Sequence, residues 1–171
     1  HAILEVHDFN TVAKQIFDAC AAIIGAKAGY VALLSDDGEE NELLFLEDGG
    51  MKCTVNPDLP MPIRGLRGVA YETGRAVYDN DFMKSEWVEF MPEGHMGLRN
   101  VLFAPLNVDG KTMGIMGFAC KNGDFTEADA EMAAAFGRYA AIALRNSFFI
   151  EKLEQHSMEL EEMNKTKDNL L

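Results

Sequence analysis

The sequence predicts an α+β domain with helices at its two ends and β-hairpins between them. Residues 8–24 repeat apolar side chains at helical spacing, which is typical of an amphipathic helix. Two apolar runs flank Asp109 and Gly110, the dipeptide favoured in a two-residue hairpin turn. From residue 125 onward, a capping sequence is followed by a long helical pattern.

The first helix is expected to end before a turn bracketed by Gly25 and Gly29. The segments GYVALLS and NELLFLE follow, on either side of the turn DDG, so they are expected to pair as a hairpin. MKCTV at 51–55 is a further short β-like segment. The apolar residues expected on the buried face of the helix are Val12, Ile16, Ala19, Cys20 and Ile23.

The middle of the chain is expected to be rich in loops. Residues 56–65 contain three prolines, which lack a backbone donor and fix φ, so this segment cannot be an inner strand. Residues 65–75 indicate a short helix that ends at Gly74, and residues 76–81 a short strand. One or two helical turns are expected at 82–91, before the loop MPEGHMGLRN, which contains His95.

The second hairpin, around Asp109 and Gly110, has the strongest β pattern of the chain. Pro105 predicts a bulge or a bend in its first strand, and Gly114 and Gly117 predict close approach by another backbone or by a ligand. In the helix that follows, Thr126 and Asp129 form a T-x-x-D capping box with Thr126 as the N-cap. The expected buried stripe of this helix is Met132, Phe136, Tyr139, Ala140, Ala143 and Leu144.

The pattern changes beyond Asn146, where apolar side chains recur in steps of four and three. This heptad spacing predicts a coiled-coil-like signalling helix over residues 148–171, distinct from a domain at 1–147. We expect a parallel homodimer seam, with a frayed tail in solution as the alternative. Leu153, Leu160 and Lys167 occupy one seam position, and Phe149, His156, Met163 and Leu170 occupy the other.

Composition narrows the classes of partner and the compartment. The net charge of −13 argues against a surface that binds nucleic acid, because such surfaces need clustered Lys and Arg, and it disfavours docking on anionic membranes. No secretory signal and no apolar stretch long enough to span a bilayer are visible, so no membrane insertion is expected. Three separated cysteines fit reduced thiols in the cytoplasm. The chain opens without Met and stops in mid-pattern, so we expect a piece of a longer protein.

Motifs that carry catalysis are missing from the sequence. It has no P-loop, no H-E-x-x-H, no G-x-S-x-G and no C-x-x-C, and no nucleophile stands near a base and an orienting group in any known spacing. We therefore expect that this module is not an enzyme, although a full-length protein containing it could be a histidine kinase.

The order of the elements resembles that of the GAF domain, over about residues 8–147. The segments that carry the resemblance are IFDACAAIIGAKAGYVALLS, then RGLRGVAYETGRAVYDND, then LRNVLFAPLNVDGKTMGIMGFACKNGDFTEADAEMAAAFGRYAAIALRNS. The variant with SEW, MPEGH and NVLFAPL is similar to GAF modules in sensor histidine kinases of archaea and anaerobic bacteria, which belong to two-component systems.

This resemblance implies a GAF-like (profilin-like) fold. A central antiparallel sheet of five or six strands would carry the terminal helices on one face and pocket loops, about residues 53–100, on the other. The implied function is a small-molecule or redox sensor that regulates a covalently linked output domain through the C-terminal helix. The residues expected at the ligand pocket are Cys53, Met61, Trp87, Phe90, Met91, His95, Met96, Phe103 and Met116.

The identity of the ligand stays open, with haem as one alternative. Some GAF sensors hold haem through a histidine, so His95 would be the axial ligand and would bind metal only in that case. Cys53 would sit on the same roof. A histidine in a loop equally suits a structural role. A further alternative is a ligand-free dimerisation module whose pocket is filled by its own side chains.

Three other activities of the family fit the residues less well. Cyclic-nucleotide-binding relatives carry an asparagine and a glutamate where this chain has Cys120 and Ala130. Bilin-binding relatives place a cysteine beside a histidine, and none adjoins His95. Free methionine sulfoxide reductases carry cysteines in the segment before the last hairpin, and residues 54–119 contain none.

Overall fold

The computed structural model describes the backbone of residues 2–51, 55–56 and 58–170, with side chains described from Phe9 onward. Its centre is a sheet of five antiparallel strands in the order β2-β1-β5-β4-β3. This confirms the predicted sheet of five or six strands. The strands are β1 (Ala28–Leu34), β2 (Asn41–Glu47), β3 (Val77–Asp79), β4 (Val101–Val108) and β5 (Lys111–Ala119).

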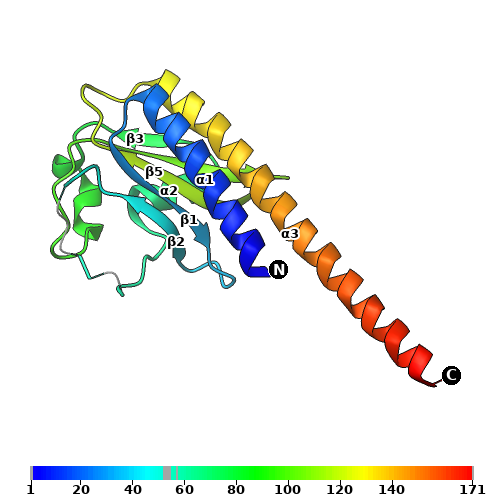
Figure 1. Ribbon diagram of the computed structural model, residues 1–171. Helices are drawn as coiled ribbons and strands as arrows, with labels where there is room; N and C mark the ends of the chain where they lie inside the picture. The colour runs from blue at the N-terminus through cyan, green and yellow to red at the C-terminus, as the bar shows by residue number, and fades with distance from the viewer. Residues whose placement is uncertain (1, 52–54, 57, 171) are drawn as a thin grey trace.

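Helices cover both faces of the sheet, as Figure 1 shows. The terminal helices α1 (Ala2–Ile24) and α3 (Glu127–Leu170) run side by side over one face. On the other face lie α2 (Gly65–Thr73) and two short 3₁₀ helices, η1 (Phe82–Lys84) and η2 (Glu86–Phe90). The predicted α+β layering is therefore confirmed. The predicted β-like segment at 51–55 falls mostly outside the described residues.

The main core lies between the terminal helices and the sheet. The Phe17 ring stacks on the Phe118 ring with centroids 5.0 Å apart. Gly29 leaves room for this pair, since a Cβ there would lie 2.7 Å from the Phe17 ring. The predicted face of α1 was right in part: Cys20 is buried and Ile16 is partly buried, whereas Val12, Ala19 and Ile23 are exposed. The residues that α1 buries are Phe9, Ala13, Phe17, Cys20 and Ile24.

The helix α3 packs through small side chains. At Gly137, a Cβ would lie 2.4 Å from the carbonyl oxygen of Pro105, so the helix approaches β4 too closely for large residues. Met132 and Tyr139, predicted in the buried stripe, are exposed for this reason, whereas Ala140 and Leu144 were placed correctly. The buried residues of α3 are Ala130, Ala133, Gly137, Ala140, Ala141 and Leu144.

The predicted β4-β5 hairpin and its flanking signals are confirmed. Asp109 and Gly110 both have positive φ, 52° and 74°, as a type I′ turn requires. The register shifts between Pro105 and Asn107, which is the predicted bulge. At Gly114, a Cβ would lie 2.3 Å from the carbonyl oxygen of Ala32, so this glycine allows the close approach of β1.

Beyond the sheet, α3 continues as one projecting helix to Leu170 (Figure 1). Its apolar side chains from Phe148 onward are half or more exposed, and Leu153, Leu160 and Met163 are 61–69% exposed. Within the described part of the chain, no helix is both long and apolar enough to cross a membrane.

Candidate ligand-binding cavity

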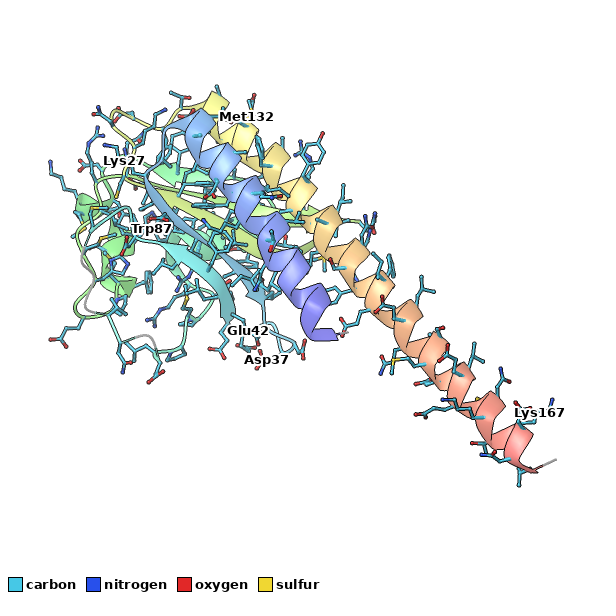
Figure 2. All side chains as sticks on the ribbon, in the orientation of Figure 1. Lys27, Asp37, Glu42, Trp87, Met132 and Lys167 are labelled. Atoms are coloured by element: carbon cyan, nitrogen blue, oxygen red, sulfur yellow. The ribbon has the colours of Figure 1, made fainter. Side chains whose placement is uncertain are left out.

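A cavity of about 770 Å³ lies on the sheet face opposite α1 and α3. The strands β1, β4 and β5 form its floor, and the first turn of α2 forms one wall. Residues of β2 and the segments 55–56, 58–62 and 87–98 also line it. Figure 2 shows Trp87 on this side, away from Met132 on α3. A volume of this size suits a small organic ligand.

The structure brings together most of the residues expected at the pocket. Those that line the cavity are Met61, Trp87, Phe90, Met91, His95, Met96 and Phe103. Met116 does not belong to this group: it is fully buried on the helix face of β5, near Gly137 of α3. Strand alternation explains the correction, since Gly117 faces the cavity and its neighbour Met116 must face the other way. Cys53 lies outside the described residues.

The floor of the cavity depends on a glycine in β5. A Cβ at Gly117 would lie 2.7 Å from the ring of Tyr30 and 3.2 Å from the ring of Phe103. The two rings pack against each other with centroids 6.4 Å apart. The predicted close approach at Gly117 is therefore the approach of these two aromatic side chains, which form an apolar base.

One end of the cavity is polar, and the sequence analysis missed it. Asn41 opens β2 and is only 5% exposed, and its side-chain carbonyl accepts a hydrogen bond from Tyr71 of α2 at 2.5 Å. Burial raises the pKa of Tyr71, so its hydroxyl keeps its proton and donates. Asn41 and Tyr30 both line the cavity. This cluster joins residues far apart in sequence, so only the sheet order could have revealed it.

Charged residues also line the cavity. The guanidinium group of Arg67 donates from Nε and from Nη2 to the carbonyl of Pro62, at 3.2 and 3.0 Å. Arg64 lies over the Phe90 ring, 5.7 Å from its centroid. Acidic residues also line the cavity, and they are Glu40, Glu47, Asp48 and Asp58.

His95 lies at the cavity wall and is half-buried. Its Nδ1 is 2.7 Å from the backbone carbonyl oxygen of Met96. A carbonyl oxygen can only accept, so Nδ1 is the donor in this contact, and Nε2 takes no part in it. The sequence left open whether this side chain meets the pocket or the solvent, and the structure places it in the cavity lining.

The described thiols are not arranged for catalysis. Burial, followed by the charge of Asp129, raises the pKa of Cys20 to about 12. Burial also raises the pKa of Cys120. Neither thiol is therefore a ready thiolate nucleophile near neutral pH. Within the described ranges, no three side chains of His, Cys, Asp or Glu are grouped to hold a metal ion.

The roof of the cavity is tied to the loop before α3. Asn100 is fully buried, and its side-chain amide donates to the carbonyls of Lys121 at 3.0 Å and Gly123 at 2.7 Å. Its side-chain carbonyl accepts from the Lys121 amide at 2.9 Å. Next to η1, Asn80 exchanges two hydrogen bonds with the backbone of Phe125, at 3.0 and 2.7 Å. Residues 121–125 are therefore held by hydrogen bonds to segments that flank the roof.

Comparisons with known proteins agree with this arrangement. The fold is similar to a GAF domain/HD domain protein from Geobacter sulfurreducens (16% identity, TM-score 0.69, covering 84% of this chain and 96% of that one). It is also similar to the second GAF domain of DevS from Mycobacterium smegmatis (19% identity, TM-score 0.64, 84% and 97%). A third similar structure is a type II free methionine-R-sulfoxide reductase from Thermoplasma acidophilum (14% identity, TM-score 0.60, 81% and 96%).

At these identities the structural likenesses show the fold alone. A search of curated proteins gives no match. The family model that describes the GAF domain matches residues 6–145, which is most of the chain and includes the whole sheet and the cavity. The chain therefore belongs to the GAF domain family, whose members are sensory signalling modules.

Proposed function

We propose that this domain senses a small molecule in the cavity and regulates an output domain joined to α3, in a cytoplasmic signalling protein such as a sensor histidine kinase. One observation carries the proposal. The cavity of about 770 Å³ is roofed by segments that flank the hydrogen bonds holding the start of α3. A ligand that prefers one arrangement of the roof would shift the population of positions at residues 121–125.

The proposed role is regulatory and not catalytic. The described thiols have raised pKa values, and they are absent from the described lining of the cavity, whose polar residues are of the types Tyr, Asn, Arg, His, Asp and Glu. We assign residues 1–147 to the sensor and residues 148–171 to a signalling helix that continues to the output domain. The unbroken helix α3 across residue 147 supports a mechanical link between them.

Exposed apolar residues support dimerisation through α3. The heptad steps of the tail extend backward without a break through residues 146, 142, 139, 135 and 132. Met132, Tyr139 and Ile142 are 40–68% exposed, and all three fall on these steps. The proposed parallel seam therefore begins beside the sheet and not at Phe149, which would couple the sensor directly to the dimer axis.

The sensing proposal can be tested with the chain's single tryptophan. Trp87 lines the cavity, so its fluorescence reports on occupancy. We expect a screen of small metabolites to find a compound that both raises the thermal midpoint and changes Trp87 emission. The same compound should change amide exchange at residues 121–125. If no compound does both, the cavity is not a ligand site, and a ligand-free dimerisation module becomes the better description.

Haem is a second candidate ligand, favoured by the orientation of His95. The hydrogen bond from Nδ1 to Met96 leaves Nε2 as the nitrogen that could bind iron, which is the usual arrangement for a histidine ligand. Haem would supply redox or gas-binding chemistry in the cavity. Reconstitution followed by absorption spectroscopy tests this. A stoichiometric Soret band that His95→Ala shifts would support it, and no band at all would exclude it.

A further inference from the structure

The polar end of the cavity contains two buried polar atoms with no partner in the described part of the chain. These are the hydroxyl of Tyr30 and the side-chain Nδ2 of Asn41, and both residues line the cavity. Asn41 is only 5% exposed to solvent. Leaving a buried donor unpaired costs free energy on the order of 1–3 kcal/mol. Neither atom is open to a water-sized group in this arrangement, so small movements of neighbouring side chains are needed to reach them. Two unpaired atoms in the lining of one cavity mark where a ligand would gain hydrogen bonds by such a movement.

The orientation of the Asn41 amide follows from Tyr71. The Tyr71 hydroxyl donates to Oδ1 of Asn41 at 2.5 Å, which leaves only Nδ2 unpaired. If the amide were reversed, the Tyr71 proton and Oδ1 would both lose their partners. Nδ2 can only donate, and the Tyr30 hydroxyl can donate as well. The missing group is therefore a hydrogen-bond acceptor.

The surroundings favour an acceptor that carries negative charge or a strong dipole. Arg67 is close to Asn41, because Arg67 donates to the carbonyl of Pro62 while the backbone N–H of Asn41 donates to the neighbouring carbonyl of Met61 at 2.8 Å. The first turn of α2, residues 65–67, lines the cavity and contains no acidic side chain, so the positive end of the helix dipole is not neutralised there.

The acidic residues of the cavity only weakly oppose the positive potential of Arg67 and of the α2 N-terminus. Glu47, Asp48 and Asp58 are exposed, and solvent screens charges of this kind. Glu40 is half-buried and precedes Asn41, so it is the one carboxylate that counts against an anion. The floor of the cavity, with the Tyr30 and Phe103 rings, is apolar and suits a flat hydrocarbon body.

We propose that the cavity binds a molecule with an apolar, aromatic-sized body and one carbonyl or carboxylate group. Oxygens of this group accept hydrogen bonds from Nδ2 of Asn41 and from the hydroxyl of Tyr30, either one oxygen from both donors or one oxygen from each. The proposal rests on the proposed sensing function and names the ligand class of the same cavity. Neutral carbonyls and carboxylates share this acceptor chemistry, and the experiment below separates them.

Three probes of similar shape test the proposal on the full chain: 2-naphthylacetate, 2-naphthylacetamide and 2-ethylnaphthalene. Dissociation constants come from Trp87 fluorescence and NMR titration. We expect at least one oxygen-bearing probe to bind about tenfold or more tighter than 2-ethylnaphthalene, which corresponds to ~1.4 kcal/mol. The carboxylate probe should be the tighter of the two if the field of Arg67 outweighs that of Glu40, and the amide probe if it does not.

Two conservative variants assign this preference to the named atoms. Tyr30→Phe removes only the hydroxyl. Asn41→Asp removes the Nδ2 donor but keeps the oxygen that accepts from Tyr71. Both variants should lose most of the tenfold preference while binding 2-ethylnaphthalene as before. Tyr30→Phe should not lower the thermal midpoint, because the hydroxyl has no protein partner in the described chain.

The outcomes separate this proposal from the sensing function. Equal affinity for all three probes, or a preference that both variants retain, overturns the acceptor site but leaves a cavity that binds ligands. An ordered water molecule that already satisfies Tyr30 and Asn41 would give the same equal affinities. Absence of binding by every probe at millimolar concentration, combined with a failed metabolite screen, counts against the sensing function itself.

Discussion

One carboxylate oxygen of Asp129 serves two partners at the start of α3. Oδ2 accepts from the backbone amide of Thr126 at 3.0 Å and from the Lys121 ammonium group at 2.5 Å. The Asp129 amide in turn bonds the Thr126 hydroxyl at 3.2 Å. This is the capping box that the sequence predicted, and it is confirmed. The ion pair with Lys121 was not predicted, because the loop 121–125 must fold back to form it.

Removing the cap should cost measurable stability. Thr126→Ala deletes the hydroxyl that accepts from the Asp129 amide, so the free energy of unfolding should fall by about 1 kcal/mol. Urea denaturation followed by circular dichroism measures the change. Thr126→Ser keeps the hydroxyl and is the control. An equal loss in both variants would show that the methyl group, and not the cap, matters.

The same carboxylate gives stability a defined pH dependence. Burial raises the pKa of Asp129, but hydrogen bonds from Lys121 and Thr126 and the charge of Lys121 together hold it below the ordinary value of 3.8. As the pH falls below 3.8, the unfolded state therefore binds more protons than the folded state does. The stability that Asp129 contributes is present above that pH and is lost on acidification.

Asp129→Asn isolates this contribution. The difference in unfolding free energy between the native chain and the variant should be constant near neutral pH and should shrink as the pH falls through the acid range. Subtraction removes the contribution of Asp37, whose pKa is also lowered by its hydrogen bond from Ser35. A difference that stays constant down to the lowest folded pH would mean that the ion pair contributes nothing.

Residue types explain how much of the cavity was predictable. Trp87 and Phe90 are large apolar side chains in a loop-rich region. The expectation that these loops cover one face of the sheet was enough to predict them in the cavity lining. Asn41 could not be found this way, because its role depends on Tyr71, thirty residues away on another element. Met116 was misplaced because both faces of a central strand are apolar. Its hydrophobicity therefore does not indicate on which face of the sheet the side chain lies.

At the scale of elements, the kinds of helix and strand were predictable but the packing faces of the helices were not. The sequence of α1 has apolar residues on more than one side, so counting them cannot choose between Ile23 and Ile24. The choice is made by Gly29, which leaves space for Phe17. In α3 the large apolar residues were predicted to be buried. The helix approaches β4 so closely at Gly137 that mainly small residues are buried there instead.

Two glycine-to-alanine changes in helices should therefore have opposite signs. Alanine is intrinsically the better helix former by about 1 kcal/mol. At Gly137, however, the new Cβ would lie 2.4 Å from the Pro105 carbonyl, so Gly137→Ala should destabilise by ~1–3 kcal/mol. At Gly68 of α2, the nearest atom is 3.7 Å away, and Gly68→Ala should stabilise slightly. Denaturant unfolding of both variants measures the signs, and a stable Gly137→Ala would refute the proposed packing constraint.

For the whole molecule, the proposed route from the cavity to an output domain runs along the surface of α3. Its packed side is made of small residues against the sheet, and its exposed side carries Met132, Tyr139, Ile142 and then the tail. A single helix cannot bury both sides. Since the exposed stripe follows heptad steps over more than three heptads, we propose a second copy of this chain as its partner.

The proposed seam predicts a position-specific effect on mass in solution. Leu160 lies on the heptad steps and Met158 does not, although both are about 60% exposed (61% and 58%). We expect the native chain to sediment as a dimer, Leu160→Glu to dissociate it, and Met158→Glu to leave it intact, because only the first places two carboxylates in the seam. Deletion of residues 148–171 should weaken the dimer without abolishing it, since Met132, Tyr139 and Ile142 remain. A native monomer, or equal effects of the two glutamates, would mean that α3 does not pair in this register.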